Sequence, residues 1–232
     1  LELGGKSPNI VFADTEDLAK AAQVSAMGIF RNSGQVCIAG SKILVERSIH
    51  REFVEQLVAI AEGLKIGDPL DLEQQIGCVA NAAQLERNLA FVARAKEQGA
   101  VLLTGGEALH QVSGGCYMQP TIFDEVDPEM DIANCEAFGP ILAVIPFDTE
   151  EQAIAIANST EFGLAAALWT ANLSRAHRLV KAVKAGVVHV NTYGGADITV
   201  PLGGHKQSGN GVDKSLHAID KYTELKTAWI QL

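Results

Sequence analysis

The sequence predicts an α/β fold: an open, mostly parallel, twisted sheet with helices on both faces. Three observations predict it. Segments with helical periodicity alternate with short apolar segments almost from end to end of the 232 residues. The apolar segments have strand length and are nearly continuous in apolarity, which is typical of strands covered on both faces. Alternating strands and helices imply right-handed βαβ crossovers, whose ligands bind in loops at the carboxyl ends of the strands.

Four amphipathic helices are expected, because apolar residues recur in each at helical spacing. Their ranges are 48–64, 81–99, 149–158 and 173–186. We expect Ser48 to cap the first helix and Gly99 to stop the second. Thr149 and Gln152 have capping-box spacing at the start of the third helix, and Gly186 is expected to cap the end of the fourth.

Short β-rich segments separate these helices. They are 42–46, 100–104, 141–147, 166–170 and 186–191, with 10–12 as the end of a further strand. A glycine-rich stretch, 193–211, then interrupts the alternation. After it we expect a short helix at 214–225 and a lone strand at 226–232, an arm that would pair with another chain and so imply an oligomer.

Composition narrows the functional classes. The hydrophobic share is 47%, the charged share is 20% and the formal net charge is −10. A strongly acidic chain is a poor binder of nucleic acid or anionic membranes. We find neither a secretion leader nor an apolar run of 18 residues, which favours a cytoplasmic protein. The cysteines, Cys37, Cys78, Cys116 and Cys135, match no zinc spacing, so we expect no metal and no disulfide.

Three short strings carry groups suited to one chemistry. LELGGK holds the carboxylate of Glu2, FRNSGQVC holds the thiol of Cys37, and CEAFGP holds Glu136 beside Phe138. Each string alone is weak evidence, because a lone glutamate is usually a solvated surface residue and a free cysteine is usually a small buried hydrophobe.

Together and in this order, the strings resemble the aldehyde dehydrogenase superfamily. EFGLAAALWT, VVHVNT and PLGGHKQSG also look like signatures of that family, so the resemblance covers the whole chain. It implies an edge of a Rossmann-type cofactor domain at 1–4, a catalytic domain at 5–207, and a return segment with an oligomerisation arm at 208–232. The cofactor would be NAD or NADP, the substrate a small aldehyde, and the complete protein a homodimer or homotetramer.

By this resemblance Cys37 is the nucleophile and Glu2 the general base. Attack of a thiolate on an aldehyde gives a thiohemiacetal, from which hydride leaves to the nicotinamide. The resulting thioester needs a base that activates water. The backbone N–H of Cys37 would supply half of an oxyanion hole, and in the family an asparagine before residue 1 supplies the other half.

The resemblance also implies cofactor contacts. Glu136 would hydrogen-bond the nicotinamide ribose, and Phe138 would pack near the nicotinamide ring. Gln84 stands where the family often has another ribose contact, although an exposed helical glutamine is an equally good interpretation.

Substrate recognition is expected beside the thiol and in the loop before PLGG. Val36 and Ile38 flank Cys37. In the loop, Tyr193 can cap a cationic chain and Asp197 offers it a carboxylate, although Asp197 also suits a turn cap. The C-terminal segment is similar to that of γ-glutamyl-γ-aminobutyraldehyde and ω-aminoaldehyde dehydrogenases, which suggests an aminoaldehyde substrate.

Departures from the family pattern concern the shape of the pocket. They are Cys135, Ala137, Leu202 and His205. We expect His205 to be structural, and the three cysteines other than Cys37 to serve packing.

Two alternatives remain open. A cysteine esterase or acyltransferase would use Cys37 with a histidine and need no nicotinamide. A non-catalytic oligomerisation module would bury Cys37 as an inert residue.

Overall fold

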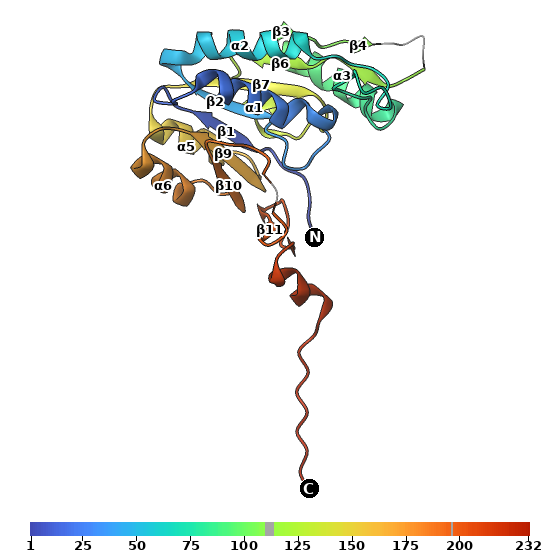
Figure 1. Ribbon diagram of the computed structural model, residues 1–232, viewed down its shortest axis with the longest axis vertical. Coiled ribbons are helices and arrows are strands. Elements are labelled where there is room, and N and C mark those ends of the chain that lie inside the picture. Colours follow the sequence, from blue (N-terminus) through green and yellow to red (C-terminus); the bar gives the residue numbers. More distant parts are fainter. Residues whose placement is uncertain (110–113, 196) are drawn as a thin grey trace.

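The computed structural model describes residues 1–109, 114–195 and 197–232, and a seven-stranded twisted sheet forms its centre (Figure 1). The strand order is β10-β9-β1-β2-β7-β6-β3. All neighbours in this sheet are parallel except β3, which runs antiparallel to β6. The strands are β1 Pro8–Val11, β2 Lys42–Glu46, β3 Val101–Thr104, β6 Thr121–Asp124, β7 Ile141–Phe147, β9 Ala165–Trp169 and β10 Val187–Val190.

Helices cover both faces of the sheet, as the sequence predicts (Figure 1). The helices are α1 Leu18–Phe30, α2 His50–Gly63, α3 Ala82–Glu97, α4 Asp131–Asn134, α5 Glu150–Asn158 and α6 Leu173–Ala182. Helices α1 and α2 pack on one face, and α3, α4, α5 and α6 pack on the other. The predicted α/β class is therefore confirmed.

Strand β2 shows why the central strands are apolar throughout. Successive side chains of a strand point to opposite faces. Ile43 and Val45 accordingly pack with α1 and α2, while Leu44 packs with the core on the other face. All three are fully buried, so neither face tolerates a polar residue there.

Side-chain caps begin four of the helices. Asp17, Asn81, Thr149 and Asn172 each accept a hydrogen bond from the backbone N–H three residues later. The expected Thr149 cap is confirmed, although Gln152 accepts from the N–H of Asp148 rather than completing a capping box.

Two expected helix ends are wrong. Ser48 lies in a short 3-10 helix, Arg47–Ile49, and α2 begins after Ile49 without a side-chain cap. The last helix ends at Ala182 with Val183 as its C-cap, so Gly186 instead precedes β10. Gly99 does follow the end of α3, with φ of +99°.

The expectation that the strands are buried on both faces is wrong for the two edge strands, β3 and β10. Strand β3 alternates between exposed and half-buried residues, and β10 is only partly buried. Each has a single neighbour in the sheet, so fewer groups cover its side chains. Helix α1 and strand β6 lie in segments where no helix or strand is predicted from the sequence.

The C-terminal segment extends away from the domain (Figure 1). A 3-10 helix, Leu216–Tyr222, occupies the place of the expected short helix. Residues 223–232 form no strand and are exposed, so the predicted arm strand at 226–232 is not formed in this chain. Two-stranded pairs complete the described structure: β4 Ala108–Leu109 with β5 Tyr117–Met118, β8 Phe162–Gly163 with β12 His205–Lys206, and β11 Leu202–Gly203 with β13 Val212–Asp213.

Within the described residues, no helix has the length and apolarity needed to cross a membrane.

Candidate active site

The residues singled out in the three strings meet at the amino edge of the sheet. Gly5 precedes β1, Cys37 precedes β2 and Glu136 precedes β7. Because these three strands are parallel, the segments that lead into them lie at the same edge. The expectation that the site lies at the carboxyl ends of the strands is therefore wrong.

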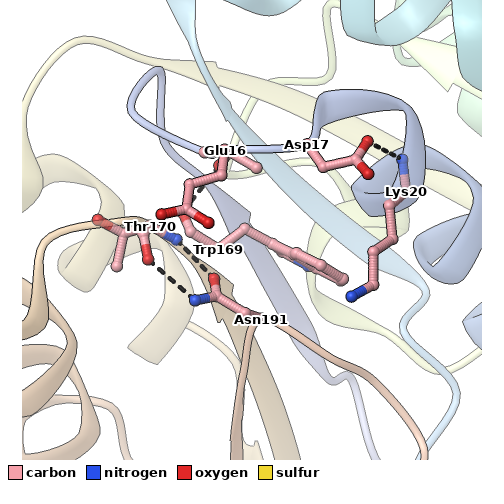
Figure 2. A pocket seen from close by; sticks show the side chains of 7 residues that line it. Glu16, Asp17, Lys20, Trp169, Thr170 and Asn191 are labelled. Atoms are coloured by element: carbon pink, nitrogen blue, oxygen red, sulfur yellow. Dashed lines mark hydrogen bonds between the residues drawn. The ribbon is translucent and has the colours of Figure 1, made fainter.

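A small polar pocket, of about 80 Å³, lies at the carboxyl ends of β1, β9 and β10 (Figure 2). There Thr170 and Asn191 exchange two hydrogen bonds, and the Asp17 side chain accepts from the N–H of Lys20, as Figure 2 shows. These polar groups satisfy one another, and the pocket contains no cysteine or histidine.

A tight turn presents Cys37. Three consecutive residues before it have left-handed backbones: Asn32 with φ of 52°, Ser33 with φ of 55° and Gly34 with φ of 70°. Non-glycine residues seldom adopt this conformation, and such strain persists only where the surroundings enforce it. Cys37 itself is half-buried and free.

Side chains enforce the turn. Ser33 Oγ donates to the carbonyl of Gly77 at 2.8 Å, and Gln35 Oε1 accepts from the N–H of Ala80 at 2.8 Å. Asn32 Nδ2 donates to the carbonyl of Gln35 at 2.9 Å. The letters SGQ of FRNSGQVC thus fix the loop that carries the thiol.

Two glycines let the three strings come together. A Cβ on Gly4 would collide with the carboxylate of Glu136, and a Cβ on Gly5 would collide with the carbonyl oxygen of Cys37. The N–H of Gly5 donates to Glu136 Oε1 at 3.0 Å. The LELGGK backbone therefore passes between the thiol loop and the CEAFGP loop.

Residues around Ser208 hold the segment that carries Glu2. The N–H of Leu3 donates to the carbonyl of Ser208 at 2.9 Å, and Ser208 Oγ donates to the carbonyl of Gly4 at 2.8 Å. Ser208 is fully buried and also accepts from the N–H of Gly163. The Glu2 side chain remains exposed.

The surroundings of Cys37 raise the pKa of its thiol. Burial raises the pKa of Cys37, and the negative charges of Glu2 and Glu136 raise it further. The backbone N–H groups of Ile38 and Cys37 interact with the sulfur and act in the opposite direction on this pKa. The same N–H groups suit an oxyanion that forms beside the sulfur.

Glu136 has its own perturbed environment. Burial raises its pKa, and the hydrogen bond from Gly5 and the charge of Lys6 oppose the shift. Lys6 is almost fully buried, and burial lowers its pKa to about 8. Lys42 is also buried, with its pKa lowered to about 7 by burial and by nearby lysines.

Phe138 and Gln84 lie close to Glu136, in or against the CEAFGP loop. Phe138 has a left-handed backbone, φ of 53°, and leaves 40% of its surface exposed. Gln84 Nε2 donates to the carbonyls of Ala137 and Phe138 and to Asn88 Oδ1. The interpretation of Gln84 as merely an exposed glutamine is wrong, because its amide holds the loop of Glu136 and Phe138.

A hollow of about 610 Å³ lies beside the thiol loop. Three residues predicted to contact substrate line it: Val36, Ile38 and Tyr193. Their role in recognition stays a prediction. The Tyr193 hydroxyl donates to the carbonyl of Ile38 at 2.5 Å, and burial raises the pKa of Tyr193. Asp197 does not share this hollow, and its carboxylate accepts from the N–H and hydroxyl of Thr199 in a turn.

Three buried polar residues near the site are not among those predicted from the sequence: Lys6, Lys42 and Ser208. Lys6 stands within LELGGK and Ser208 within PLGGHKQSG, so both residues belong to strings that the sequence already singled out. Nothing local to KILVE indicates that Lys42 is buried. Packing is also the wrong role for Cys78 and Cys135, which are exposed, whereas Cys116 is half-buried. His205 is exposed and pairs through its backbone with Gly163.

Fold and site together place the chain among α/β enzyme domains that carry a thiol at the amino edge of a parallel sheet. Residues 1–228 match the profile of the aldehyde dehydrogenase family. The chain belongs to this family.

Relatives support this assignment along the whole chain. The chain is 50% identical over 232 residues to the NADP/NAD-dependent aldehyde dehydrogenase PuuC of Escherichia coli, covering 100% of this chain and 46% of PuuC. A crystal structure of an indole-3-acetaldehyde dehydrogenase with NAD⁺ superposes with a TM-score of 0.97 at 53% identity, covering 100% of this chain and 47% of that one.

The γ-glutamyl-γ-aminobutyraldehyde dehydrogenase structure from Burkholderia cenocepacia superposes with a TM-score of 0.94 at 51% identity. It covers 97% of this chain and 46% of that one. The chain thus spans about half the length of the relatives it matches.

Proposed function

We propose that this chain is the catalytic portion of an NAD(P)-dependent aldehyde dehydrogenase in which Cys37 is the nucleophile and Glu2 the general base. The observation that carries the proposal is the meeting of Cys37, Glu136 and the Gly4–Gly5 backbone at one edge of the sheet. Three strings separated by long stretches of sequence converge there around a half-buried thiol.

The first step is addition of the thiol to the aldehyde. The thiol proton passes to Glu2, the sulfur forms a bond to the carbonyl carbon, and the carbonyl oxygen becomes an oxyanion. The N–H groups of Cys37 and Ile38 lie at the sulfur and stabilise this charge. A raised thiol pKa makes the base necessary, since little thiolate is present at neutral pH.

The second step releases the acid. Loss of hydride from the former carbonyl carbon leaves a thioester on Cys37. Glu2 first releases the thiol proton to solvent and then takes a proton from water, whose oxygen adds to the thioester carbon and expels the Cys37 thiolate. The thiolate regains a proton from Glu2, which restores the starting thiol and carboxylate. The exposure of Glu2 suits this role, because the attacking water must reach it.

The residues present fit a nicotinamide cofactor. Glu136 offers a half-buried carboxylate that can accept from ribose hydroxyls, and Phe138 offers an exposed ring beside it. When bound, NAD(P) accepts the hydride. Gln84 positions both residues through the loop carbonyls, and a direct ribose contact by Gln84 remains part of the proposal.

The wider assignments follow from the family. We extend the proposal to a cytoplasmic homodimer or homotetramer with domains at 1–4, 5–207 and 208–232, in which residues 226–232 become a strand on pairing with another chain. Residues 223–232 are extended and exposed, which supports the proposal that this segment pairs with another chain.

For the substrate, we propose an ω-aminoaldehyde or a γ-glutamylaminoaldehyde. The support is the identity of 51% to a protein named as a γ-glutamyl-γ-aminobutyraldehyde dehydrogenase. The hollow that would receive it is lined by Val36, Ile38 and Tyr193. For Asp197 to bind substrate, its carboxylate must first give up its hydrogen bonds from Thr199.

A chimera tests the proposal. The chain is joined to the part of PuuC that precedes its matching region, and NADH formation from butanal is measured. We expect Cys37→Ala to abolish turnover, whereas Cys116→Ala leaves it within severalfold. Turnover that survives Cys37→Ala would refute the proposal, and ester hydrolysis that needs no nicotinamide would favour the cysteine esterase instead.

A further inference from the structure

The hollow beside the thiol loop has the size of a small-molecule site, at about 610 Å³. Its surface is mainly apolar. The apolar side chains that line it are those of Val24, Met27, Val36, Ile38 and Ala39, together with the ring of Tyr193. This surface suits a chain of methylenes between an aldehyde and whatever group the substrate carries at its far end.

The hollow carries one fixed charge, which is positive. Among the described residues that line it, Arg31 is cationic and none is acidic. The phenol of Tyr193 is neutral, because burial raises its pKa and its hydroxyl donates to Ile38. Glu2 and Glu136 interact with the thiol but do not line the hollow.

Arg31 is also free to bind a ligand. Within the described part of the chain, its guanidinium neither pairs with a carboxylate nor donates a hydrogen bond. The other arginines all do one or the other: Arg47, Arg51, Arg87, Arg94, Arg175 and Arg178. Arg31 is therefore an exposed, unpaired cation at the edge of an apolar hollow.

We propose that Arg31 binds a carboxylate at the far end of the aldehyde substrate. A guanidinium binds carboxylates through two parallel hydrogen bonds, which fixes orientation as well as charge. This inference rests on the proposed function and narrows it. A γ-glutamyl derivative retains a carboxylate and fits Arg31, whereas a free ω-aminoaldehyde brings only a cation to a cationic hollow.

The test uses this 232-residue chain with Cys78, Cys116 and Cys135 changed to serine, so that Cys37 is its one thiol. An aldehyde adds to Cys37 with the thiol proton moving to the carbonyl oxygen, and the thiohemiacetal is protected from iodoacetamide. Protection by 4-oxobutanoate, butanal and 4-(trimethylammonio)butanal is compared. We expect 4-oxobutanoate to protect at about three- to fivefold lower concentration than butanal, and the cation to protect least.

Variants assign the preference to Arg31. Arg31→Gln should bring 4-oxobutanoate to the level of butanal, and Arg31→Lys should keep part of the difference. Arg51→Gln removes an exposed arginine from α2, outside the hollow, and should change nothing.

The outcomes separate this inference from the function on which it rests. Protection by butanal with no preference for 4-oxobutanoate, or a preference that survives Arg31→Gln, would overturn the role of Arg31 alone. Absence of protection by every aldehyde, in the PuuC chimera as well as in this chain, would overturn the proposed function and this inference with it.

Discussion

The N–H of Gly5 donates a 3.0 Å hydrogen bond to Oε1 of Glu136, a residue 131 positions further along the chain. The bond holds a carboxylate next to the thiol loop, and the charge of that carboxylate raises the pKa of Cys37. The two motifs are therefore electrostatically coupled, and the coupling can be measured.

We expect Glu136→Gln to lower the pKa of Cys37. The substitution removes a negative charge that disfavours the thiolate, and the amide oxygen can still accept from Gly5. The pH dependence of iodoacetamide alkylation, measured with Cys37 as the one thiol, should move its inflection to lower pH. Glu62→Gln, on the far part of α2, serves as the control, and an inflection that stays in place or rises would contradict the coupling.

Buried Lys42 makes stability depend on pH. Its folded-state pKa is about 7, below the unfolded value of 10.5, so the unfolded chain binds more protons between these limits. The free energy of unfolding should therefore rise with pH from about 7, by at most about 1.4 kcal/mol per unit for this one group. His50, whose pKa is raised by its hydrogen bond with Asp124, opposes the trend just above pH 6.5. Cys37 and Tyr193, whose pKa values are also raised, oppose it above about pH 9.

Lys42→Met should flatten that rise and increase stability near pH 7. Lys42 Nζ donates to the carbonyl of Ile156, which still accepts from Ser159 after the substitution. Urea denaturation at pH 7, 8 and 9 gives the slopes, with the exposed Lys65→Met as the control. Parallel slopes for the parent and Lys42→Met would show that Lys42 is not protonated on unfolding.

The sequence predicted correctly those features that depend on residues close together along the chain. The Thr149 cap needs only the next few residues, and the periodicity of α2, α3, α5 and α6 reflects burial of one face of each helix. The three strings also predicted which residues meet, because LELGGK, FRNSGQVC and CEAFGP carry both the chemistry and the glycines that allow close approach.

The features that were not predicted from the sequence depend on packing between residues far apart along the chain. Which edge of the sheet holds Cys37 depends on where its loop enters β2, and the general rule for parallel sheets gave the wrong edge. The burial of Lys42 and the exposure of β3 depend on neighbours distant in sequence. The partners of Asp197 are local, and the alternative of a turn cap was available from the sequence.

We expect these 232 residues alone to form no NADH from aldehydes. The chain spans about half the length of its relatives. We infer from the resemblance to the family that one oxyanion donor and most of the cofactor site belong to the part that the chain does not span. NADH formation by the purified chain with butanal and NAD is measured against the PuuC chimera. Turnover by the chain alone at a rate near that of the chimera would show that the cofactor site lies within these residues.

The turn before Cys37 gives the sharpest test of stored strain. Gly34 has φ of +70°, and a Cβ there would collide with the carbonyl of Gly139 and lie 2.8 Å from the nitrogen of Pro140. Both obstacles are backbone atoms, so neither can move aside without shifting the loop of Glu136 and Phe138. We expect Gly34→Ala to lower the free energy of unfolding by about 1–3 kcal/mol or more.

Gly63 offers the matched control for this prediction. It is the last residue of α2, and a Cβ there meets nothing within 4 Å. Alanine restricts the unfolded chain without strain in the helix, so Gly63→Ala should raise the free energy of unfolding by about 0.4–1 kcal/mol. Urea denaturation of both variants gives the two signs. Equal effects of the two substitutions would show that the left-handed turn beneath the thiol stores no strain.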